Sequence, residues 1–316
     1  PGEAAAALEA AFDEIARLES VLSDWKTDSE LSRLNREAAS GPFACSGDLY
    51  DFVAEGVRLW EATSGAFDLT VAPLVALWDL RGEGRAAGDA ELAATMRRVG
   101  SARLRLDGPA RTVFFQAPGM GLDPGALGKG YALDAAARVL RARGVKAALL
   151  DFGGQLLAIG APAGRAGWEA AVAHPLRRDE AALTVILKDE SIATSGNAER
   201  GLIVDGRQMG HVLDPATGRP IAWRGSASVI AASAAEADAL STALLVMGPD
   251  RGLAWAAGRE GLTPLFLEED ERGELVVRPG PGLRKRPAAP WGGAAAGIAG
   301  DGRWWHGVGE VRRLSR

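Results

Sequence analysis

A glycine-rich turn ahead of a helix is the first stretch whose residue types suggest chemistry. Residues 122–143, LDPGALGKGYALDAAARVLRAR, begin with a tight Pro-Gly turn and continue as an amphipathic helix that Gly144 ends. Free backbone amides and the positive end of the helix dipole make such a helix start suitable for a phosphate. Asp123 precedes the turn, Lys129 adds a cationic side chain, and the glycines let the backbone approach a ligand closely. The stretch predicts a phosphate site, with a purely structural turn as the alternative.

Two familiar phosphate motifs do not fit this turn. A Walker A loop requires a glycine at position 123 and a Ser or Thr after the lysine, where this chain has Asp123 and Gly130. The dinucleotide pattern G-x-G-x-x-G does not fit the spacing either. A phosphate site here is therefore of a different type.

A second group of oxygen-bearing side chains follows a capping box. Ser233 to Glu236 form the box and start a helix, in which Asp238, Ser241 and Thr242 follow at i, i+3 and i+4. Three such side chains on one helical face suit a hard cation, and a solvated helix face is the alternative. The neighbouring alanines and leucines favour a buried helix, in which a carboxylate needs a partner.

Among the three histidines, His211 is the candidate for proton transfer. It lies in GHVLDPATGRPI, residues 210–221, where turn-forming residues fix the backbone and leave the imidazole as the titratable group. A structural role as a cap of the DPATG turn is the alternative. His174 precedes Pro175 in a loop and His306 lies in the C-terminal stretch, so both are weaker candidates.

Helices and strands alternate along the chain. Helices are predicted at 3–22, from Ser29-Glu30, from Ser46 to the TSG at 63–65, after Pro73, at 90–98, at the two chemical stretches above and at 249–258. Strands are predicted up to Leu122, in a hairpin at 102–106 and 112–116, on both sides of Gly153-Gly154, and at 168–173, 182–188, 226–232 and 263–267. Residues 191–200 are expected to form a turn-rich loop, and Thr70-Val71 an extended segment.

Three details of these elements concern the core and the site. The first helix has a predicted apolar stripe of Leu8, Phe12, Ile15, Leu18 and Leu22. Trp25 lies in the polar loop that follows, as a lid over the local core or as a platform for a ligand ring. Asp68 lies between Phe67 and Leu69, where a carboxylate requires hydrogen bonds.

Composition excludes some classes of function. The 316 residues are 47% hydrophobic and 24% charged, which is typical of a globular protein with a core. The net charge of −5 argues against a general nucleic-acid binder, and the single cysteine, Cys45, excludes an internal disulfide. No apolar run is long enough to span a membrane. From about residue 279 the composition changes to Pro, Gly, Ala and Arg, so we expect one domain over 1–278 and an irregular extension over 279–316.

Six stretches occur in an order and at spacings that are specific in combination. They are AFDLTVAPLVALW, LDPGALGKGYALD, LLDFGGQLLAIG, IATSGNAERG, HVLDPATGRP and SAAEADALSTALLVMG. Together they resemble the ApbE family, the FAD:protein FMN transferases, over about residues 5–270. The resemblance implies a T-fold-like α+β fold with mainly antiparallel sheets. Two related sheet-helix halves would form one compact unit with the FAD site between them.

The resemblance also implies an activity. The family takes FAD, releases AMP, and joins FMN through its phosphate to a Thr or Ser hydroxyl of a target flavoprotein, in a reaction that depends on Mg²⁺. Two alternatives would use the same pocket, namely an FAD pyrophosphatase and a non-catalytic flavin carrier. The expected location is the periplasm or the periplasmic side of a membrane, with a lipid anchor upstream of Pro1, and the cytoplasm is the alternative.

Residue roles follow from the same resemblance. Contacts to the flavin nucleotide would come from Trp25, Ala66, Phe67, Asp68, Asp123, Lys129 and Leu213. Mg²⁺ would be held by the Ala126 carbonyl, Asp238 and Thr242, with Ser241 nearby. The catalytic candidates are His211 and Asp123.

The chain departs from the family pattern at several places. Family members begin with a strand that carries a Met-Gly-Thr segment, whereas this chain starts at the first helix. Ser241 stands where the family has an Asp near the metal, and Trp25 where it often has a Tyr. The stretch after residue 280 lies outside the pattern.

Overall fold

The structure is a computed structural model that describes residues 2–197, 202–204 and 207–284. Its helices are α1 (Gly2–Leu22), α2 (Glu30–Glu37), α3 (Gly47–Ala62), α4 (Ala72–Leu77), α5 (Asp89–Met96), α6 (Gly128–Ala142), α7 (Ala234–Ala256) and α8 (Pro281–Arg284), with 3₁₀ turns η1 (Leu69–Val71) and η2 (Ser101–Arg103). Its first strands are β1 (Phe43–Ala44), β2 (Leu104–Asp107), β3 (Thr112–Phe115), β4 (Ala148–Phe152), β5 (Gln155–Ile159), β6 (Trp168–Ala173), β7 (Ala181–Leu187) and β8 (Ser191–Gly196). The later strands are β9 (Leu202–Val204), β10 (Arg207–Met209), β11 (Leu213–Asp214), β12 (Arg219–Pro220), β13 (Gly225–Ala231), β14 (Thr263–Glu269) and β15 (Leu275–Pro279).

A six-stranded sheet in the order β15-β14-β13-β8-β5-β4 forms the centre of the molecule, and every neighbouring pair is antiparallel. Side chains alternate between its two faces. Ala193 and Val229 face α7 in the main core, whereas Ile192 and Ile230 pack against the β6–β7 hairpin. The central strands are therefore covered on both sides.

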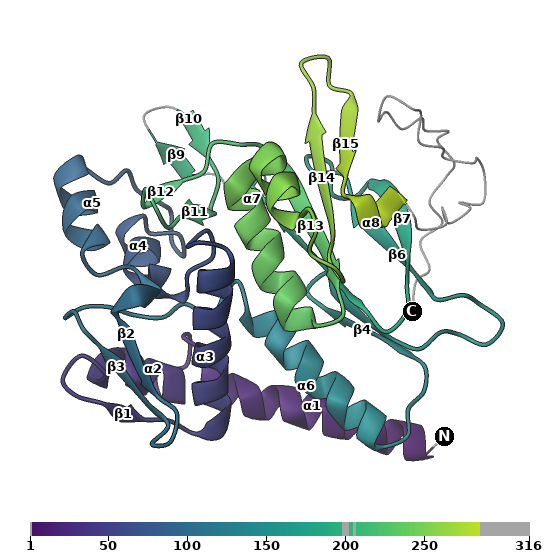
Figure 1. The fold of residues 1–316 in the computed structure, drawn as a ribbon, viewed down its shortest axis with the longest axis horizontal. Helices are drawn as coiled ribbons and strands as arrows, with labels where there is room; N and C mark the ends of the chain where they lie inside the picture. Colours follow the sequence, from purple (N-terminus) through teal and green to yellow (C-terminus); the bar gives the residue numbers. More distant parts are fainter. Residues whose placement is uncertain (1, 198–201, 205–206, 285–316) are drawn as a thin grey trace.

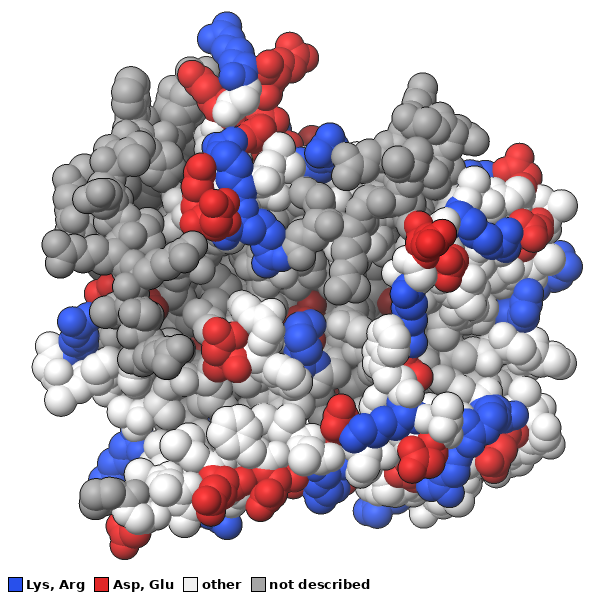
Figure 2. All heavy atoms as spheres, turned by 180° about the vertical axis from the view of Figure 1, so that it is seen from behind, with Lys and Arg blue, Asp and Glu red and all other residues white. Residues whose placement is uncertain are grey.

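Helix α6 packs against both α1 and α7, and Figure 1 shows these three helices beside the large sheet. A smaller sheet, in the order β1-β3-β2, lies with α2 and α3 at the other side of the molecule. The architecture is a compact α+β unit with mainly antiparallel sheets, which confirms the predicted fold class. The described surface mixes charges of both signs, as the face in Figure 2 shows.

Helices α6 and α7 cap each other. The Asp134 carboxylate of α6 accepts hydrogen bonds from Ala234 N–H (2.9 Å) and Ala235 N–H (3.0 Å) in the first turn of α7. The Asp238 carboxylate of α7 accepts one from Gly130 N–H (3.0 Å) in the first turn of α6. Each helix thus supplies the acceptor that the other helix's free amides need.

The residues up to Leu122 do not form a strand, so that prediction is wrong. Their backbone is held by Asn35, whose Nδ2 donates to the Leu122 carbonyl (2.9 Å) and whose Oδ1 accepts from Leu122 N–H (2.8 Å). Asp123 N–H donates to the Leu69 carbonyl (2.8 Å). A side-chain amide from α2 therefore takes the place of a neighbouring strand.

The predicted loop at 191–200 is wrong for its first six residues, which form β8 in the middle of the large sheet. Serine and threonine favour turns because their hydroxyls compete for backbone groups. Here the hydroxyls have partners within the fold. Ser191 Oγ donates to the Leu156 carbonyl (2.7 Å), and Thr194 Oγ1 bonds to Ser228 Oγ (2.8 Å). Residues 198–200 lie outside the described part.

The predicted apolar stripe of α1 is only partly correct. Its later members are buried or partly buried, but Leu8 and Phe12 are 52% and 68% exposed. Ala7 and Ala11 are buried instead, in a cluster that includes Ala136 of α6. Small residues on both helices allow a close approach, which a stripe of large residues would prevent.

Thr70-Val71 belongs to η1, so the extended segment predicted there is wrong. The helix predicted from residue 249 is present, because a non-helical Gly248, whose φ is 74°, divides α7 into two helices and the second runs to Ala256. Regular structure continues past residue 278, because β15 ends at Pro279 and α8 follows it. Residues 285–316, including the aromatic stretch with His306, lie outside the described part.

Gly130 should be required for packing of α6 against α7. A Cβ atom at this position would lie 2.1 Å from the Ala234 carbonyl oxygen and 2.5 Å from its carbon. We expect Gly130→Ala to lower the free energy of unfolding by about 1–3 kcal/mol or more, as overpacking does. Urea titration measures this change. Gly128→Ala is the matched control, because its Cβ would meet only Pro124 Cβ at 3.5 Å. Equal stability of the two variants would contradict the close-approach argument.

Candidate active site

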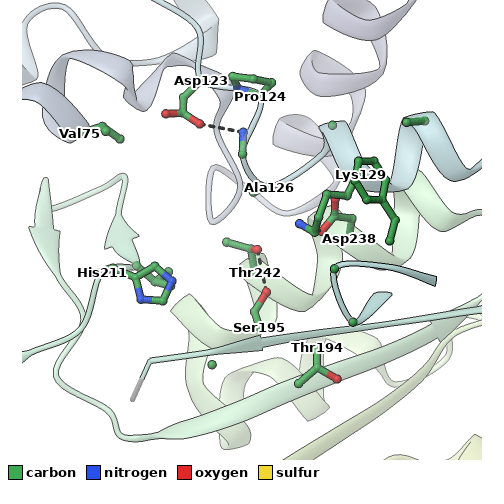
Figure 3. Close-up of a pocket in the computed structure, with 18 of the residues that line it drawn as sticks. Val75, Asp123, Pro124, Ala126, Lys129, Thr194, Ser195, His211, Asp238 and Thr242 are labelled. Atoms are coloured by element: carbon green, nitrogen blue, oxygen red, sulfur yellow. Dashed lines mark hydrogen bonds and ion pairs between the residues drawn. The ribbon is translucent and has the colours of Figure 1, made fainter. Parts of the chain in front are cut away.

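A pocket of about 1140 Å³ is lined by segments from both the N-terminal helices and the large sheet. Its wall comes from α1, the η1–α4 segment, the turn before α6, the β4–β5 turn, the β6–β7 hairpin, β8, the loop before β11, and α7. Eleven of the twelve predicted site residues line it, namely Trp25, Ala66, Phe67, Asp68, Asp123, Ala126, Lys129, His211, Leu213, Asp238 and Thr242. Figure 3 shows several of them around one space. The structure therefore brings together residues that lie far apart in the sequence.

The Asp238 carboxylate forms the charged centre of the pocket. It is buried, and Lys129 Nζ lies 3.2 Å from its Oδ1 while Gly130 N–H bonds to its Oδ2. Burial raises the pKa of Asp238 above its ordinary value, and Lys129 and the Gly130 amide oppose that rise. A cation thus already neutralises this carboxylate in the free protein.

Three hydroxyl groups lie beside this carboxylate. Ser195 Oγ bonds to Thr242 Oγ1 (2.9 Å) and to Ser241 Oγ (2.8 Å). Ser241 Oγ also donates to the Asp238 carbonyl (2.8 Å), and its side chain does not line the pocket. Thr242 is therefore the hydroxyl that α7 presents to the pocket, and Ser241 supports it from behind.

The donor set fits a hard cation only in part. No group of three or more His, Cys, Asp or Glu side chains suited to a metal occurs among the described residues. A carboxylate, a hydroxyl and a backbone carbonyl, from Asp238, Thr242 and Ala126, are all oxygen donors of the kind Mg²⁺ accepts. Mg²⁺ commonly completes its coordination with water and substrate phosphates. These three donors would suit a magnesium ion only when water and the phosphates of a substrate supply the remaining ligands.

Asp123 lies at the beginning of the turn before α6, whereas Lys129 lies at its end. Its Oδ1 accepts from Gly125 N–H (2.7 Å), which fixes the turn, and its Oδ2 accepts from Arg81 Nη2 (2.7 Å). Burial raises the pKa of Asp123, and the nearby Asp24 raises it further, whereas Gly125 N–H and Arg81 lower it. The carboxylate is thus a structural support of the turn as well as part of the pocket wall.

The Asp68 carboxylate is occupied within the protein. Its Oδ1 accepts from Thr70 N–H (2.8 Å), Thr70 Oγ1 (2.7 Å) and Ser101 Oγ (2.7 Å), and its Oδ2 from Ser101 N–H (3.0 Å). The hydrogen bonds required by its position between two apolar residues are therefore present. Asp68 fixes the 66–68 segment against the pocket and caps η1.

His211 lies on the wall across from the turn before α6, as Figure 3 shows. Its loop is fixed by Asn197, whose Nδ2 donates to the carbonyls of Ile221 (2.8 Å) and Trp223 (3.0 Å). The following turn is held by Asp214, whose Oδ2 accepts from Thr217 Oγ1 (3.0 Å). This agrees with a turn-forming role for Asp214 and leaves the imidazole facing the pocket.

Three further residues line the pocket that the sequence does not single out as site residues, namely Arg81, Ser195 and His174. The turn-forming neighbours of Ser195 predict a loop at its position. His174 is buried, and its Nδ1 accepts from the N–H groups of Leu176 and Arg177 (both 3.2 Å), which shapes the β6–β7 turn. No spacing signal in the sequence pointed to Arg81.

Comparisons with known proteins show which family the chain belongs to. The model of the ApbE family matches residues 3–266, so the chain belongs to the ApbE family. A relative from Vibrio cholerae serotype O1, named FAD:protein FMN transferase, is 34% identical over 256 residues, which are 79% of this chain and 76% of the relative. One from Klebsiella pneumoniae (strain 342) with the same name is 34% identical over 238 residues, 73% of this chain and 68% of the relative. These relatives are enzymes, and this family member is an enzyme too.

Solved structures give the same result. The flavin transferase ApbE from Vibrio cholerae superposes with a TM-score of 0.77 at 31% identity and covers 88% of this chain and 91% of its own. The apo form of Pseudomonas stutzeri flavinyl transferase ApbE gives a TM-score of 0.78 at 30% identity, with 90% of each chain covered.

None of the described helices has the length and apolarity that crossing a bilayer requires.

Replacing Lys129 should make stability more sensitive to pH. The pKa of Asp238 is raised in the folded protein, so protonation of this carboxylate favours the folded state. This contribution to the free energy of unfolding is fully present in acid and is lost as the pH rises through the folded-state pKa. Lys129→Met removes the opposing charge and raises the pKa further. We expect the variant to lose on the order of 1–2 kcal/mol more than the wild type between about pH 4 and pH 8, since the Lys129 side chain is 39% exposed and solvent screens the pair.

Urea unfolding at several pH values measures this difference. The control is Lys188→Met, at an exposed position in the turn after β7. A Lys129→Met deficit that is the same in acid and at pH 8 would show that the Lys129–Asp238 pair does not control the titration.

Proposed function

We propose that this enzyme transfers FMN from FAD to a Thr or Ser hydroxyl of a target flavoprotein and releases AMP. One observation carries the proposal. The start of α6, with the positive end of its dipole and Lys129, meets the Asp238 and Thr242 oxygens of α7 in a single pocket large enough for a dinucleotide. The names of the relatives, FAD:protein FMN transferase, support it.

Binding places the diphosphate of FAD at the turn before α6. The positive end of the α6 dipole and the Lys129 side chain attract the phosphate oxygens. The 66–68 segment and Trp25 provide the wall for the rings, and Trp25 is exposed enough (73%) to meet one. Mg²⁺, held by Asp238, Thr242 and the Ala126 carbonyl, would supply charge neutralisation for the phosphates.

Transfer then consists of one exchange at phosphorus. The acceptor hydroxyl oxygen forms a bond to the phosphorus of the FMN half, and the bond from that phosphorus to the bridging oxygen breaks. The bridging oxygen leaves with AMP, and the hydroxyl proton passes to the His211 imidazole. Positioning and charge neutralisation carry most of such a phosphoryl transfer. His211 adds general-base help.

Mass measurement tests the activity directly. The enzyme is incubated with FAD, Mg²⁺ and a flavoprotein domain, and the domain is then weighed and the solution assayed for AMP. We expect the domain to gain the mass of covalent FMN while AMP is released in equal amount. AMP without a mass gain would show an FAD pyrophosphatase, and intact FAD would show a flavin carrier. Removal of divalent ions with EDTA should stop the transfer.

His211→Ala should slow the transfer by about two orders of magnitude, because general-base help is worth this much. FAD affinity should stay within a few-fold, since the imidazole acts on the acceptor. The rate of the variant should also lose its dependence on pH between about 5.5 and 7.5, where a histidine ordinarily titrates. Initial rates across this pH range measure both effects.

Thr217→Ala is the control for the loop, because Thr217 is exposed and bonds to Asp214 in the same turn. It should keep the pH profile and most of the rate. A near-normal rate in His211→Ala would return His211 to a structural role.

A further inference from the structure

The last residues of β8 have no neighbouring strand on one side. The ladder between β5 and β8 stops at Ile192, because β5 begins at Gln155 and the chain turns back to β4 at Gly153-Gly154. Residues 194–196 of β8 therefore extend beyond β5, while β13 still pairs with them on the other side. A strand edge of this kind is a template for another extended segment.

The unpaired backbone groups of this edge belong to Thr194 and Gly196. Asn197 N–H donates to the Gly225 carbonyl (3.3 Å) of the strand next to β8, and such residues alternate along an antiparallel strand. Ser195 therefore turns its backbone groups toward β13, whereas Thr194 and Gly196 turn theirs away from it. Within the described part of the chain, the backbone groups of these two residues make no hydrogen bond, and both residues line the pocket.

A buried hydroxyl beside the edge also has no partner. Ser226 of β13 is 3% exposed, lines the pocket, and its Oγ makes no hydrogen bond with any described residue. It pairs across the sheet with Gly196, where a Cβ would meet only Ser226 Cβ (3.8 Å) and the Gly225 carbonyl oxygen (4.0 Å). The sheet face over Gly196 is therefore open. Because a buried hydroxyl without a partner is unfavourable, this arrangement suits a ligand that supplies one.

The edge lies beside the reacting groups. Ser195 Oγ bonds to Thr242 Oγ1 on α7, as the dashed line in Figure 3 shows, and Asn197 fixes the loop of His211. Side chains alternate between the two faces of a sheet. In a segment added along residues 194–196, the residue opposite Ser195 therefore points to the α7 face with Thr242, and its two neighbours point to the face with Ser226.

We propose that the acceptor segment of the target flavoprotein adds to this edge of β8 as a short strand. Its backbone bonds to the N–H and C=O groups of Thr194 and Gly196, as in other cases of strand addition. The acceptor Thr or Ser lies opposite Ser195, and a polar side chain of the residue opposite Gly196 bonds to Ser226 Oγ. The proposal rests on the proposed function, in which a protein hydroxyl is the acceptor.

The spacing of the free groups favours a peptide over a ring of FAD. Thr194 and Gly196 are two residues apart in a strand, so their backbone groups repeat at roughly 6.8 Å. The backbone of an extended peptide has the same repeat, with a donor and an acceptor at each step. A flavin or adenine ring carries its polar atoms at much shorter spacing and does not match both residues.

Gly196→Pro tests the strand addition. Proline is tolerated at a strand edge whose N–H has no ladder partner, so this change removes a free donor and leaves the ladder to β13. Gly196→Ala keeps the N–H and is the matched comparison. In the transfer assay we expect Gly196→Pro to raise KM for the flavoprotein domain by about three- to tenfold, and Gly196→Ala to raise it less. The FAD affinity, measured by calorimetry, should stay at the wild-type value in both.

Ser226→Ala gives a second readout, which decides where Gly196→Pro lowers the melting temperature. It should raise KM for the domain by about threefold without lowering the urea midpoint, because no hydrogen bond within the protein is lost. Ser228→Ala is the control on the same face of β13, since Ser228 Oγ bonds to Thr194 Oγ1 and does not line the pocket. It should lower the urea midpoint and leave KM unchanged.

A wild-type KM in folded Gly196→Pro or in Ser226→Ala would overturn the strand addition. Weaker FAD binding in Ser226→Ala would overturn it too, because the hydroxyl would then belong to the FAD site. If the wild type modifies the domain and the variants do so with the same KM, only the role of the β8 edge fails. If the wild type modifies no domain, the proposed transfer fails and the acceptor edge fails with it.

Discussion

The crossing of α6 and α7 determines the site, and a buried carboxylate holds it together. Asp238 accepts from the Gly130 amide and pairs with Lys129, so the first turn of α6 is fixed to the second turn of α7. An unpartnered carboxylate in this position would be strongly unfavourable. The contact also requires a glycine, since a side chain at position 130 would collide with the Ala234 carbonyl. The phosphate-type turn, the hydroxyl of Thr242 and the charge of Lys129 all take their positions from this crossing.

Two further sets of hydrogen bonds fix the turn before α6 relative to the neighbouring segments. Asn35 binds both backbone groups of Leu122 from α2, and Asp123 holds the Gly125 amide. The Asn35–Leu122 contacts join segments that lie 87 residues apart in the sequence. The turn is therefore shaped from three sides before any ligand arrives, which lowers the ordering cost of binding.

Much of this arrangement could be predicted from sequence. The capping box at Ser233 located the start of α7, and the Pro-Gly turn located the start of α6, because both signals are local. The resemblance then identified residues that the fold places in one pocket. The i, i+3 and i+4 spacing of Asp238, Ser241 and Thr242 was read as one face, but only Asp238 and Thr242 line the pocket.

Other features had no local signal. The sequence of β8 is rich in serine and threonine and therefore predicts a loop. In the fold, these hydroxyls find hydrogen-bond partners on other strands and on α7, which no local pattern reveals. Leu122 is an apolar residue before a tight turn, which predicts the end of a strand. Its side chain is indeed buried, but its backbone bonds to the side-chain amide of Asn35 and not to another strand. Arg81 follows an apolar helix in an ordinary loop, and only the tertiary fold brings it to Asp24 and Asp123. Contacts of this kind depend on which segments the topology makes neighbours.

The exchange of caps between α6 and α7 has a consequence for local opening. Helix ends ordinarily fray independently of one another, with little cost. Here, Asp134 and Asp238 lie in the second turns of α6 and α7, so opening of the first two turns of one helix removes an acceptor from the first-turn amides of the other. We therefore expect the two ends to open together, in a single subglobal event. The first turns of α6 and α7 would then keep or lose their pocket geometry together, and states in which only one of them is frayed would be sparsely populated.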